Sequence, residues 1–403
     1  MDANPPAAVR SAGRIRGLLL PFPIITAVLY TVIGVMPVYL VSAYAVRFQR
    51  DLSFGTAELG YAVSACFVAA ALGSMFLGPA VDRLGTSIGL RTASLGSAVA
   101  ALALALVASN WLMVSAALAV SGLSHIVAQL TCNSLLSREV ASGSQGKGFA
   151  GKQAAIPFAA LLAGLLVWLL GASISWRATF IAFAAICLVA AALTPASPPI
   201  PQAPERPQRR IGHAAAPLTA LAAAGAFAAL ASNSLTVLVV DAFATAGFAE
   251  AAAARVLFFG SAAAIVARTA VGWDIDRRRA RGFRELTLMM AAGSMGFLLL
   301  AVAGGSRPIL FAGILFGFAA GWGWPAVIYF TAATNSGIAP ATATAFVLSG
   351  VYVGTVIGPP LFGIIAEHAG YPTAWAVGAV ALAVGSMMTQ LSRRLAGRAL
   401  PLP

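Results

Sequence analysis

One arginine lies inside an apolar stretch, where a charged group is rare and usually functional. Arg268 sits in the run VARTAVG, four residues before Gly272. Its guanidinium carries planar N–H donors that match a carboxylate in a bidentate way, so in a low-dielectric cavity it is suited to holding an anion. Four helical residues rise only about 6 Å, so the side chain can also extend to the interface as an anchor. The residue therefore predicts either an anion site or an interfacial anchor.

A stripe of three polar residues forms a second candidate. His125, Gln129 and Asn133 are spaced at i, i+4 and i+8, which places them on one face of a helix. Polar residues inside a membrane either pack helices together or line a pore, and both interpretations fit this stripe. His125 is the interior group that titrates near neutrality, so it is a candidate proton-coupling residue as well as a neutral packing residue.

Aromatic and small polar residues at midplane depth form a weaker set, because aromatic residues in membrane helices also serve in packing. We expect four of them to contact a substrate: Tyr30, Asn233, Trp324 and Tyr352. Prolines interrupt helices at points where bending would be needed: Pro157, Pro325, Pro359 and Pro360. Lys152 begins an apolar run, and we interpret it as an interfacial anchor.

A short motif, Gly-x-x-x-Asp-Arg, occurs twice, from 78 and again from 272, an offset of 194 residues. One pattern recurring at about half the chain length indicates an internal duplication. Its glycine allows a neighbouring helix to approach closely, and its aspartate ends a helix where a partner helix or a basic residue can hold it. The motif predicts a latch, although the same residues also suit an ordinary turn. The residues concerned are Gly78, Asp82, Arg83, Gly272, Asp276 and Arg277.

The composition excludes a soluble domain. Of 403 residues, 60% are hydrophobic and 9% are charged, whereas soluble domains carry about 25% charged residues. The net charge of +13 does not indicate nucleic-acid binding, because the basic residues lie in short turns between apolar runs. The three cysteines lack metal-ligand spacing, and no Walker-type phosphate loop or nucleophile–base set occurs. We therefore expect no enzyme, no cofactor and no metal site.

Twelve apolar runs are long enough to cross a hydrocarbon core, which takes about 20 residues. Six lie near 20–46, 58–79, 88–108, 112–136, 149–170 and 176–194, and six near 216–240, 252–273, 285–304, 308–332, 342–366 and 372–392. The Pro-rich basic segment TPASPPIPQAPERPQRRIGH between them cannot continue a helix or bury a core. The sequence predicts an all-α membrane protein with bundles at 18–195 and 216–392, a linker at 196–215 and tails at 1–17 and 393–403.

The basic residues predict the orientation. If the N-terminus is inside, nineteen of the 25 Lys and Arg residues fall in cytoplasmic segments. Cytoplasmic loops carry an excess of Lys and Arg, so both termini are expected in the cytoplasm. The first apolar run follows three arginines without a small-residue cleavage site, so we interpret it as a retained helix of a multi-pass protein in the cell membrane.

These features resemble the major facilitator superfamily. The resemblance is carried by the two sets of six spans, the basic central loop and GPAVDRLG after the second span, with further likeness in SWRATF and GTVIGPPLFG. Thr86 and Ser87 depart from the family pattern, which usually has Arg or Lys there. The resemblance implies twelve transmembrane helices in two pseudo-symmetric six-helix bundles, a monomer, and a cytoplasmic gate formed by the two Gly-x-x-x-Asp-Arg motifs.

Two weaker resemblances concern the substrate. GKQAAIPFAALLAG and GWGWPAV are similar to segments of the cyanate and nitroimidazole permease branch. VARTAVG is similar to the eighth span of monocarboxylate and oxalate carriers, where an Arg binds the substrate carboxylate, but Ala264 stands where an acidic residue is expected. We expect a secondary transporter of a small organic or inorganic anion, monocarboxylate-like, with protons as a possible second partner. The alternatives are an efflux carrier for hydrophobic drugs and a non-transporting membrane sensor or scaffold.

Overall fold

The computed structural model describes residues 22–140, 145–171, 173–195, 212–278 and 280–399, and these residues are helical. The first half contains α1 (Phe22–Ala43), α2 (Ala45–Leu52), α3 (Thr56–Phe76), α4 (Gly78–Leu102), a π-helical turn η2 (Ala103–Val107), α5 (Trp111–Glu139), α6 (Gln145–Leu170) and α7 (Trp176–Leu193). The second half contains a 3-10 turn η4 (Gly212–Ala214), α8 (Ala215–Thr245), α9 (Glu250–Arg278), α10 (Phe283–Val302), α11 (Arg307–Ala319), α12 (Pro325–Asn335) and α13 (Pro340–Ala399).

The described helices make the twelve predicted crossings. Ten helices are long and apolar enough to span a membrane, and α13 is one of them. Within α13, Gly370 takes a φ of 79°, which glycine adopts readily, so this element divides into two crossings. The remaining crossing is split into α11 and α12, with Pro325 as the first residue of α12. The fold is therefore the predicted all-α membrane architecture.

The predicted ends of the bundles differ slightly from the structure. The tail predicted at 1–17 and most of the linker predicted at 196–215 lie outside the described residues. The tail predicted at 393–403 is helical as far as Ala399, because α13 continues past the apolar run.

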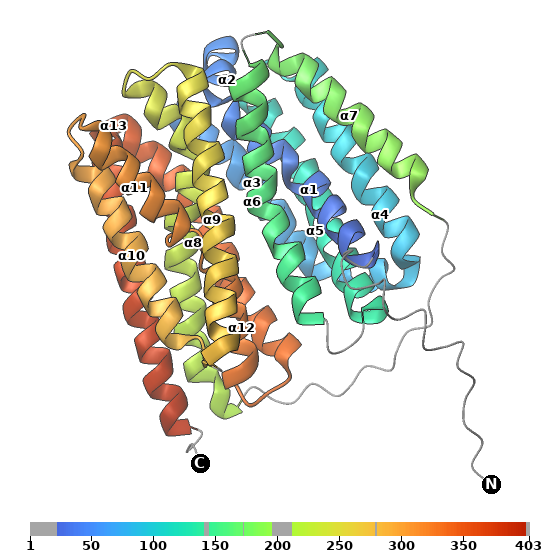
Figure 1. The fold of residues 1–403 in the computed structure, drawn as a ribbon. Helices are drawn as coiled ribbons and strands as arrows, with labels where there is room; N and C mark the ends of the chain where they lie inside the picture. Colours follow the sequence, from blue (N-terminus) through green and yellow to red (C-terminus); the bar gives the residue numbers. More distant parts are fainter. Residues whose placement is uncertain (1–21, 141–144, 172, 196–211, 279, 400–403) are drawn as a thin grey trace, which may run out of the picture.

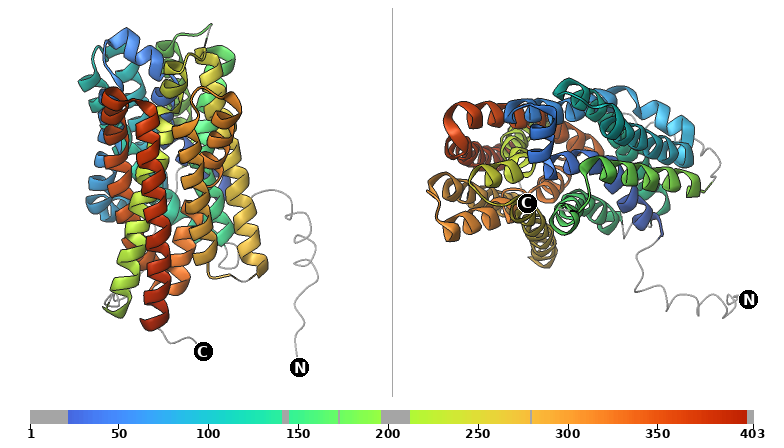
Figure 2. Two further views of the ribbon diagram at one scale, coloured as in Figure 1. Left: turned by 90° about the vertical axis from the view of Figure 1, so that its left-hand side faces the viewer. Right: turned by 90° about the horizontal axis from the view of Figure 1, so that it is seen from above.

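The helices form two groups that lie side by side. Figure 1 shows α1 to α7 on one side and α8 to α13 on the other, and the view from above in Figure 2 shows the same division. The described chain begins at Phe22 and ends at Ala399 at the same end of the molecule, which we call the terminal side. The opposite end, which carries α2, is called the far side. The ribbons of the two groups lie closer together at the far side than at the terminal side in Figure 1.

Close backbone packing at glycines holds each half together. A Cβ added to Gly354 of α13 would lie 1.9 Å from the carbonyl oxygen of Ala226 in α8. A Cβ added to Gly122 of α5 would lie 2.0 Å from the carbonyl oxygen of Cys66 in α3. Small residues at helix interfaces are the usual means of association where lipid removes the hydrophobic driving force. These contacts explain why apolar helices with many Gly residues assemble into two compact bundles.

Packing and charge join the halves at the far side. Arg47 of α2 pairs with Glu250 of α9, with 2.7 Å between Nε and Oε1. A Cβ added to Gly60 of α3 would lie 2.4 Å from the carbonyl oxygen of Pro359 in α13. A Cβ at Gly164 of α6 would lie 2.8 Å from a backbone nitrogen of α9. The far-side ends of the halves are therefore in direct backbone contact.

A carboxylate cluster completes this far-side contact. The Thr56 hydroxyl donates a hydrogen bond to Asp241 Oδ2 across the two halves at 2.9 Å, and the Tyr371 hydroxyl donates to the same carboxylate. The backbone N–H of Ala57 donates to Glu367 Oε1, also across the halves, at 2.9 Å. We call Thr56, Ala57, Asp241, Glu367 and Tyr371 the far-side cluster. At the start of α3, the cluster gives the backbone N–H of Ala57 and the hydroxyl of Thr56 carboxylate acceptors from the other half.

Candidate functional site

Arg268 lies at the contact between the two halves. Its Nη1 donates to the carbonyl oxygen of Gln153 in α6 at 3.0 Å, and its Nη2 donates to the carbonyl oxygen of Trp322 at 2.7 Å. The residue is only 8% exposed, and its Nε has no hydrogen-bond partner among the described residues. The guanidinium is thus directed into the protein, ten residues from the end of α9 at Arg278, rather than toward the interface.

Proline-broken helices supply both acceptors of this guanidinium. In a regular helix the carbonyl of Gln153 would accept from the N–H of residue 157, but Pro157 has no N–H to give. Trp322 lies in the break between α11 and α12, just before Pro325, so its carbonyl is not used by a continuous helix. Freed carbonyls inside a membrane need new donors. Arg268 therefore binds two backbone oxygens that the sequence leaves without helical partners.

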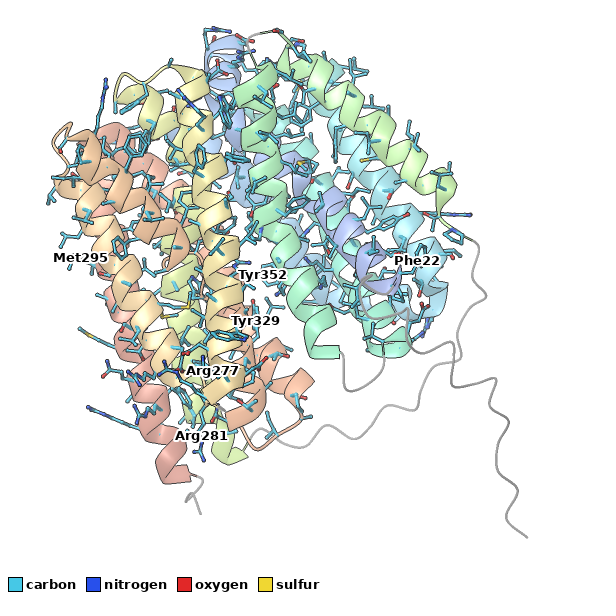
Figure 3. The ribbon with its side chains drawn as sticks, in the orientation of Figure 1. Phe22, Arg277, Arg281, Met295, Tyr329 and Tyr352 are labelled. Atoms are coloured by element: carbon cyan, nitrogen blue, oxygen red, sulfur yellow. The ribbon has the colours of Figure 1, made fainter. Side chains whose placement is uncertain are left out.

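Aromatic side chains from both halves surround the arginine. The Arg268 Cζ lies 5.3 Å from the centroid of the Trp322 ring, and the Tyr39 ring of α1 meets Trp322 edge-on at 6.1 Å between centroids. Tyr39 and Tyr329 lie close enough to interact electrostatically with the guanidinium. Figure 3 shows Tyr329 and Tyr352 where the two halves meet. The site is therefore a single cation within an aromatic wall.

The sequence identified part of this wall. Tyr352 was predicted to contact the substrate, and the structure places it beside Tyr329. Trp324, which was also predicted, is buried with an unpartnered Nε1, while its neighbour Trp322 carries the contact with Arg268. Tyr39 was missed, although it lies two residues after a proline within the first apolar run. That proline was the available signal, because helix breaks in such spans lie near central sites.

The polar stripe on α5 becomes more exposed toward the terminal side. His125 is buried, Gln129 is half-buried and Asn133 is exposed. His125 packs against Gly34 of α1, where an added Cβ would lie 3.1 Å from the His125 Cα, and the His125 Nδ1 has no partner among the described residues. The stripe thus leads from the interior of the first half to its terminal-side surface. Its contact with a substrate stays a prediction.

Lys152 is not the interfacial anchor that the sequence suggested. The residue is only 3% exposed, and its Nζ donates a hydrogen bond to Asn133 Oδ1 at 2.5 Å. The error arose because Lys152 begins an apolar run, whereas α6 starts earlier, at Gln145, and carries Lys152 into the bundle. The protein therefore buries two basic residues, Arg268 and Lys152, and the described carboxylates form no ion pair with either.

Two other predicted contact residues make bonds within one half. The Tyr30 hydroxyl donates to the carbonyl of Ala190 at 3.0 Å and lies 2.6 Å from the Thr194 hydroxyl, both in the last part of α7 or directly after it. Its polar atom holds α1 to α7 in this conformation, and its contact with a substrate stays a prediction. Asn233 Nδ2 donates to Thr355 Oγ1 at 3.1 Å, which links α8 to α13.

The glycines of the repeated motif are not at close helix contacts in this conformation. A Cβ added to Gly78 or to Gly272 would have no heavy atom within 4 Å. The expected close approach at these positions is therefore absent here. Between described residues, no hydrogen bond or ion pair joins the halves nearer the terminal side than Arg268 to Gln153. The physical reason is that the two halves contact one another at the far side and at Arg268.

The charged residues of the motif lie at the terminal-side surface. Arg83, Asp276 and Arg277 are exposed, and the Arg277 Cζ lies 5.3 Å from the centroid of the Trp273 ring. Figure 3 shows Arg277 near the terminal end of the second half. The side chain of Asp82 lies outside the described part of the structure. The gating role of these residues stays a prediction.

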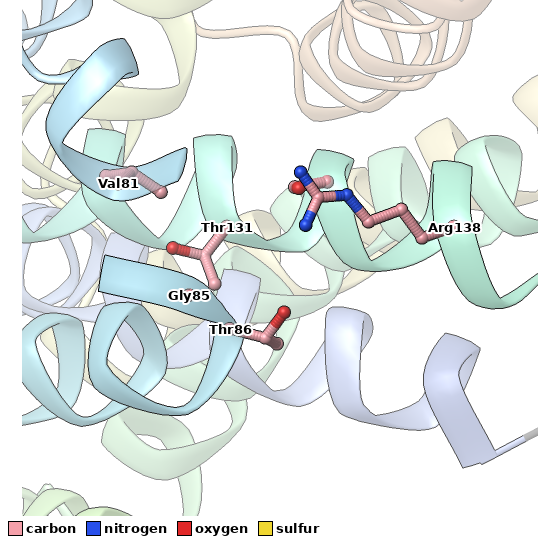
Figure 4. Close-up of a pocket in the computed structure, with 6 residues that line it drawn as sticks. Val81, Gly85, Thr86, Thr131 and Arg138 are labelled. Carbon is pink, nitrogen blue, oxygen red and sulfur yellow. The ribbon is translucent and has the colours of Figure 1, made fainter. Parts of the chain in front are cut away.

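A separate small pocket lies beside the first motif. It has an empty volume of about 170 Å³ and is lined by Val81, Gly85, Thr86, Thr131, Ser134 and Arg138 (Figure 4). These residues come from α4 and α5 of the first half alone, so the pocket is distinct from the site at Arg268. No group of three or more His, Cys, Asp or Glu residues that could hold a metal ion occurs in the described ranges.

Comparison with known proteins agrees with this architecture. A family model described as "Major Facilitator Superfamily" matches residues 24–330. No curated protein matches the chain. A solved structure of a D-xylose-proton symporter aligns with a TM-score of 0.75 and 12% identity, covering 91% of this chain and 96% of the other. A bacterial homolog of the human lysosomal transporter Spinster, in an inward-facing and occupied conformation, aligns with a TM-score of 0.67 and 16% identity, covering 93% and 96%.

A third solved structure, a partially occluded inward open conformation of the xylose transporter XylE from E. coli, aligns with a TM-score of 0.71 and 12% identity, covering 90% of this chain and 97% of the other. At these identities the structural likeness concerns the fold, while the match to the family model covers most of the chain.

Proposed function

Because the chain belongs to the Major Facilitator Superfamily, a family of secondary transporters, we propose that it moves a small organic or inorganic anion across the cell membrane by alternating access. The observation that carries this proposal is the buried guanidinium of Arg268, whose two hydrogen bonds to described residues go to neutral carbonyl oxygens. A buried charge without a counter-ion is costly, and an arriving anion would remove that cost.

The geometry at Arg268 supports a small anion with a planar head. The carbonyl oxygens of Gln153 and Trp322 accept from Nη1 and Nη2, the two nitrogens that a carboxylate engages in a bidentate pair. These carbonyls stand in for the oxygens of the substrate. A single guanidinium within a wall that includes Tyr39, Trp322 and Tyr329 suits a monocarboxylate-like anion with an apolar body.

We assign the terminal side to the cytoplasm, because the basic segments predict that both termini lie there. The structure is then an inward-facing form, held closed on the outside by the far-side cluster and the Arg47–Glu250 pair. In the other form the terminal side would close, with the repeated Gly-x-x-x-Asp-Arg motifs as its latch. The protein acts as a monomer, and the substrate reaches Arg268 alternately from each side.

The aromatic wall also favours a second candidate function. Rings such as Trp322 and Tyr39 could stack on a planar hydrophobic drug, which would make the protein an efflux carrier. The two functions differ in what Arg268 does. An anion carrier needs its charge, whereas a carrier of neutral or cationic drugs gains nothing from it.

A ligand screen with matched arginine variants distinguishes these functions. Purified protein is melted with small carboxylates, inorganic anions such as cyanate and nitrate, and lipophilic cations. A ligand at about 100 times its Kd stabilises the folded state by about 2.7 kcal/mol, which raises the melting temperature. We expect small anions to stabilise the parent and the Arg255→Ala variant but not Arg268→Ala. Arg255 lies on the same helix, exposed and over Trp168, so it controls for the loss of one positive charge.

Stabilisation of Arg268→Ala by the same anions would contradict the anion site. Stabilisation by lipophilic cations alone would favour the efflux carrier. No stabilisation by any class, together with no anion exchange in proteoliposomes, would favour a non-transporting membrane protein.

A further inference from the structure

The buried lysine of α6 has no role in the site described so far. Lys152 is 3% exposed, and among the described residues its ammonium donates one hydrogen bond, to Asn133 Oδ1, a neutral amide oxygen. An ammonium carries three N–H donors, so a single amide acceptor leaves it incompletely satisfied. A lysine in such surroundings is suited to exchanging a proton, because neither its charged nor its neutral form is strongly fixed by a carboxylate.

The groups that face Lys152 do not compensate its charge. From α5, the imidazole of His125 and the thiol of Cys132 are near enough to interact with it electrostatically. From α1, the neighbouring group is the Thr31 hydroxyl, which lies beside Cys132 and does not titrate. From α9, Arg268 donates to the carbonyl of Gln153, the next residue along α6. These groups include no described carboxylate, and the second buried cation is bound to the backbone one residue farther along α6.

We propose, building on the anion site at Arg268, that Lys152 carries the proton that travels with the anion. When the anion sits at Arg268, its negative charge favours the ammonium form of Lys152. When the anion leaves toward the terminal side, Lys152 and Arg268 remain as two buried positive charges without a described carboxylate, and Arg268 is bound to the carbonyl of Gln153, the residue after Lys152. This uncompensated charge inside the membrane favours release of the proton from Lys152. Because each ligand favours the binding of the other, anion and proton bind and leave together, which is symport.

Release of the proton changes a single bond, at the side-chain amine of Lys152. One Nζ–H bond of the ammonium breaks, its electron pair stays on Nζ as a lone pair, and the proton passes to water at the terminal side. Asn133 offers the route, because its side chain is exposed while its amide contacts Nζ. After the release, the amide can turn so that its Nδ2–H donates to the new lone pair. The step needs no other reactant than water.

This assignment differs from the role considered for His125. His125 packs against Gly34 at the buried end of the α5 stripe, farther along the helix from the terminal-side surface than Asn133. Lys152 donates a hydrogen bond to Asn133, the exposed residue of that stripe. It also directly precedes Gln153, whose carbonyl accepts from Arg268. Its position therefore connects the proton route to the anion site, whereas His125 lacks both contacts among the described residues.

Transport by charge-altered variants tests the proposal. In proteoliposomes with pyruvate as the probe, we expect the parent to accumulate pyruvate against its gradient when the outside is acidified. Lys152→Met is permanently neutral and Lys152→Arg is permanently charged, so both should keep pyruvate–pyruvate exchange but lose at least nine-tenths of the pH-driven accumulation. Lys147→Met, near the start of the same helix, should accumulate pyruvate as the parent does, and His125→Gln tests the histidine as the alternative proton carrier.

Accumulation by Lys152→Met equal to that of the parent would overturn the proposal. So would loss of exchange together with accumulation in both Lys152 variants, if these still melt like the parent, because Lys152 would then be an anion-binding or structural residue. Loss of accumulation only in His125→Gln would assign the proton to the histidine.

A direct observation of the amine does not depend on transport or on a substrate. The sequence contains lysine at two positions, 147 and 152, so Lys147→Arg protein grown with ¹³Cε-lysine gives one lysine side-chain signal. Because burial without a counter-charge disfavours the ammonium form, we expect this signal to change between the ammonium and amine forms at a lower pH than that of an exposed lysine, between about pH 6 and pH 9. A signal that stays in one form across that range overturns the proposal, even if pyruvate proves not to be the substrate. The absence of anion exchange in the parent would contradict the proposed function, and this titration would still decide the role of Lys152.

Discussion

A guanidinium inside the membrane must find an acceptor for each N–H that it cannot give to water. Arg268 meets this need with two backbone carbonyls and leaves Nε without a partner among the described residues. The carbonyl oxygens satisfy its N–H donors but do not neutralise its positive charge. The protein can therefore fold with Arg268 buried, and the guanidinium still favours an anion. This combination distinguishes a binding residue from a structural ion pair such as Arg47–Glu250.

The fork geometry of Arg268 predicts the effect of a conservative change. Lys at this position keeps the charge but cannot donate two parallel bonds to a carboxylate. A hydrogen bond to a charged group contributes about 1.5–3 kcal/mol, so we expect Arg268→Lys to weaken anion binding by about 10- to 100-fold. Isothermal titration with the anion that stabilises the parent measures this change. Affinity equal to that of the parent would show that a point charge is sufficient.

At the scale of elements, two broken helices create the site. Pro157 removes the helical partner of the Gln153 carbonyl in α6, and the break before Pro325 frees the Trp322 carbonyl. Both oxygens would be unavailable in continuous helices. The breaks therefore explain how an arginine of the second half can bind the backbone of the first.

Restoring the helix in α6 should release Arg268 to the substrate. In Pro157→Ala the new N–H competes for the Gln153 carbonyl, so an anion no longer has to displace that acceptor. One neutral hydrogen bond is worth about 0.5–1.5 kcal/mol, which predicts anion binding about 2- to 10-fold tighter, with an unchanged or higher melting temperature. Pro37→Ala, which also replaces a proline inside a helix, is the control, because the described acceptors of Arg268 are the carbonyls of Gln153 and Trp322 and not the one that Pro37 frees. Weaker binding in Pro157→Ala alone would mean that the carbonyl positions the guanidinium for the anion.

The far-side cluster holds α3 of the first half against α8 and α13 of the second half. Asp241 accepts from Thr56 of the first half and from Tyr371 of its own half. In Asp241→Asn the acceptor loses its charge, and a loss of about 1–2 kcal/mol changes a two-state ratio about 5- to 30-fold. We expect the far side to open in a larger fraction of molecules.

Spin labels at Ser109 and Ala246, exposed positions at the far-side ends of the two halves, measure this opening as a longer distance population. Glu58→Gln is the matched control, because the Glu58 carboxylate accepts from the backbone N–H of Gly55 within the first half. Equal distance distributions in Asp241→Asn and the control would show that backbone packing at Gly60 and Gly363 holds the far side closed without the carboxylate.

For the whole molecule, the structure represents one end of the proposed cycle. The halves are joined at the far side and at Arg268, and the motif glycines lie in open space. In the proposed cycle these glycines contact the other half when the terminal side closes. A Cβ added at either glycine would then leave the present form unchanged in free energy and would clash only in the form whose terminal side is closed. This difference makes glycine substitutions a probe of the conformational equilibrium.

Gly272→Ala and Gly78→Ala should therefore shift the population toward the terminal-side-open form. Labels at Ser137 of α5 and Thr334 of α12, at the terminal ends of the two halves, should report longer distances than in the parent. Gly397→Ala is the control, since that glycine also has no atom within 4 Å of an added Cβ but lies at the end of α13. Unchanged distances in both motif variants would identify the motif as an ordinary pair of turns.

The sequence alone determined the membrane class and the two sets of six crossings, and it singled out Arg268 as a candidate site residue. These properties depend on local composition: an apolar run of sufficient length has to cross the bilayer, and a guanidinium within it has to be compensated. The family resemblance added the arrangement in two bundles, which the match over residues 24–330 confirms.

Only the tertiary structure decided which partners the interior polar groups have. It paired Tyr30 with α7, buried Lys152 against Asn133, and placed Trp322 rather than Trp324 at Arg268. In a sequence this apolar, almost every face of a helix is hydrophobic, so periodicity does not show which face meets lipid and which meets another helix. The rotation of each helix is set by packing against its neighbours, and that rotation decides where each rare polar side chain lies.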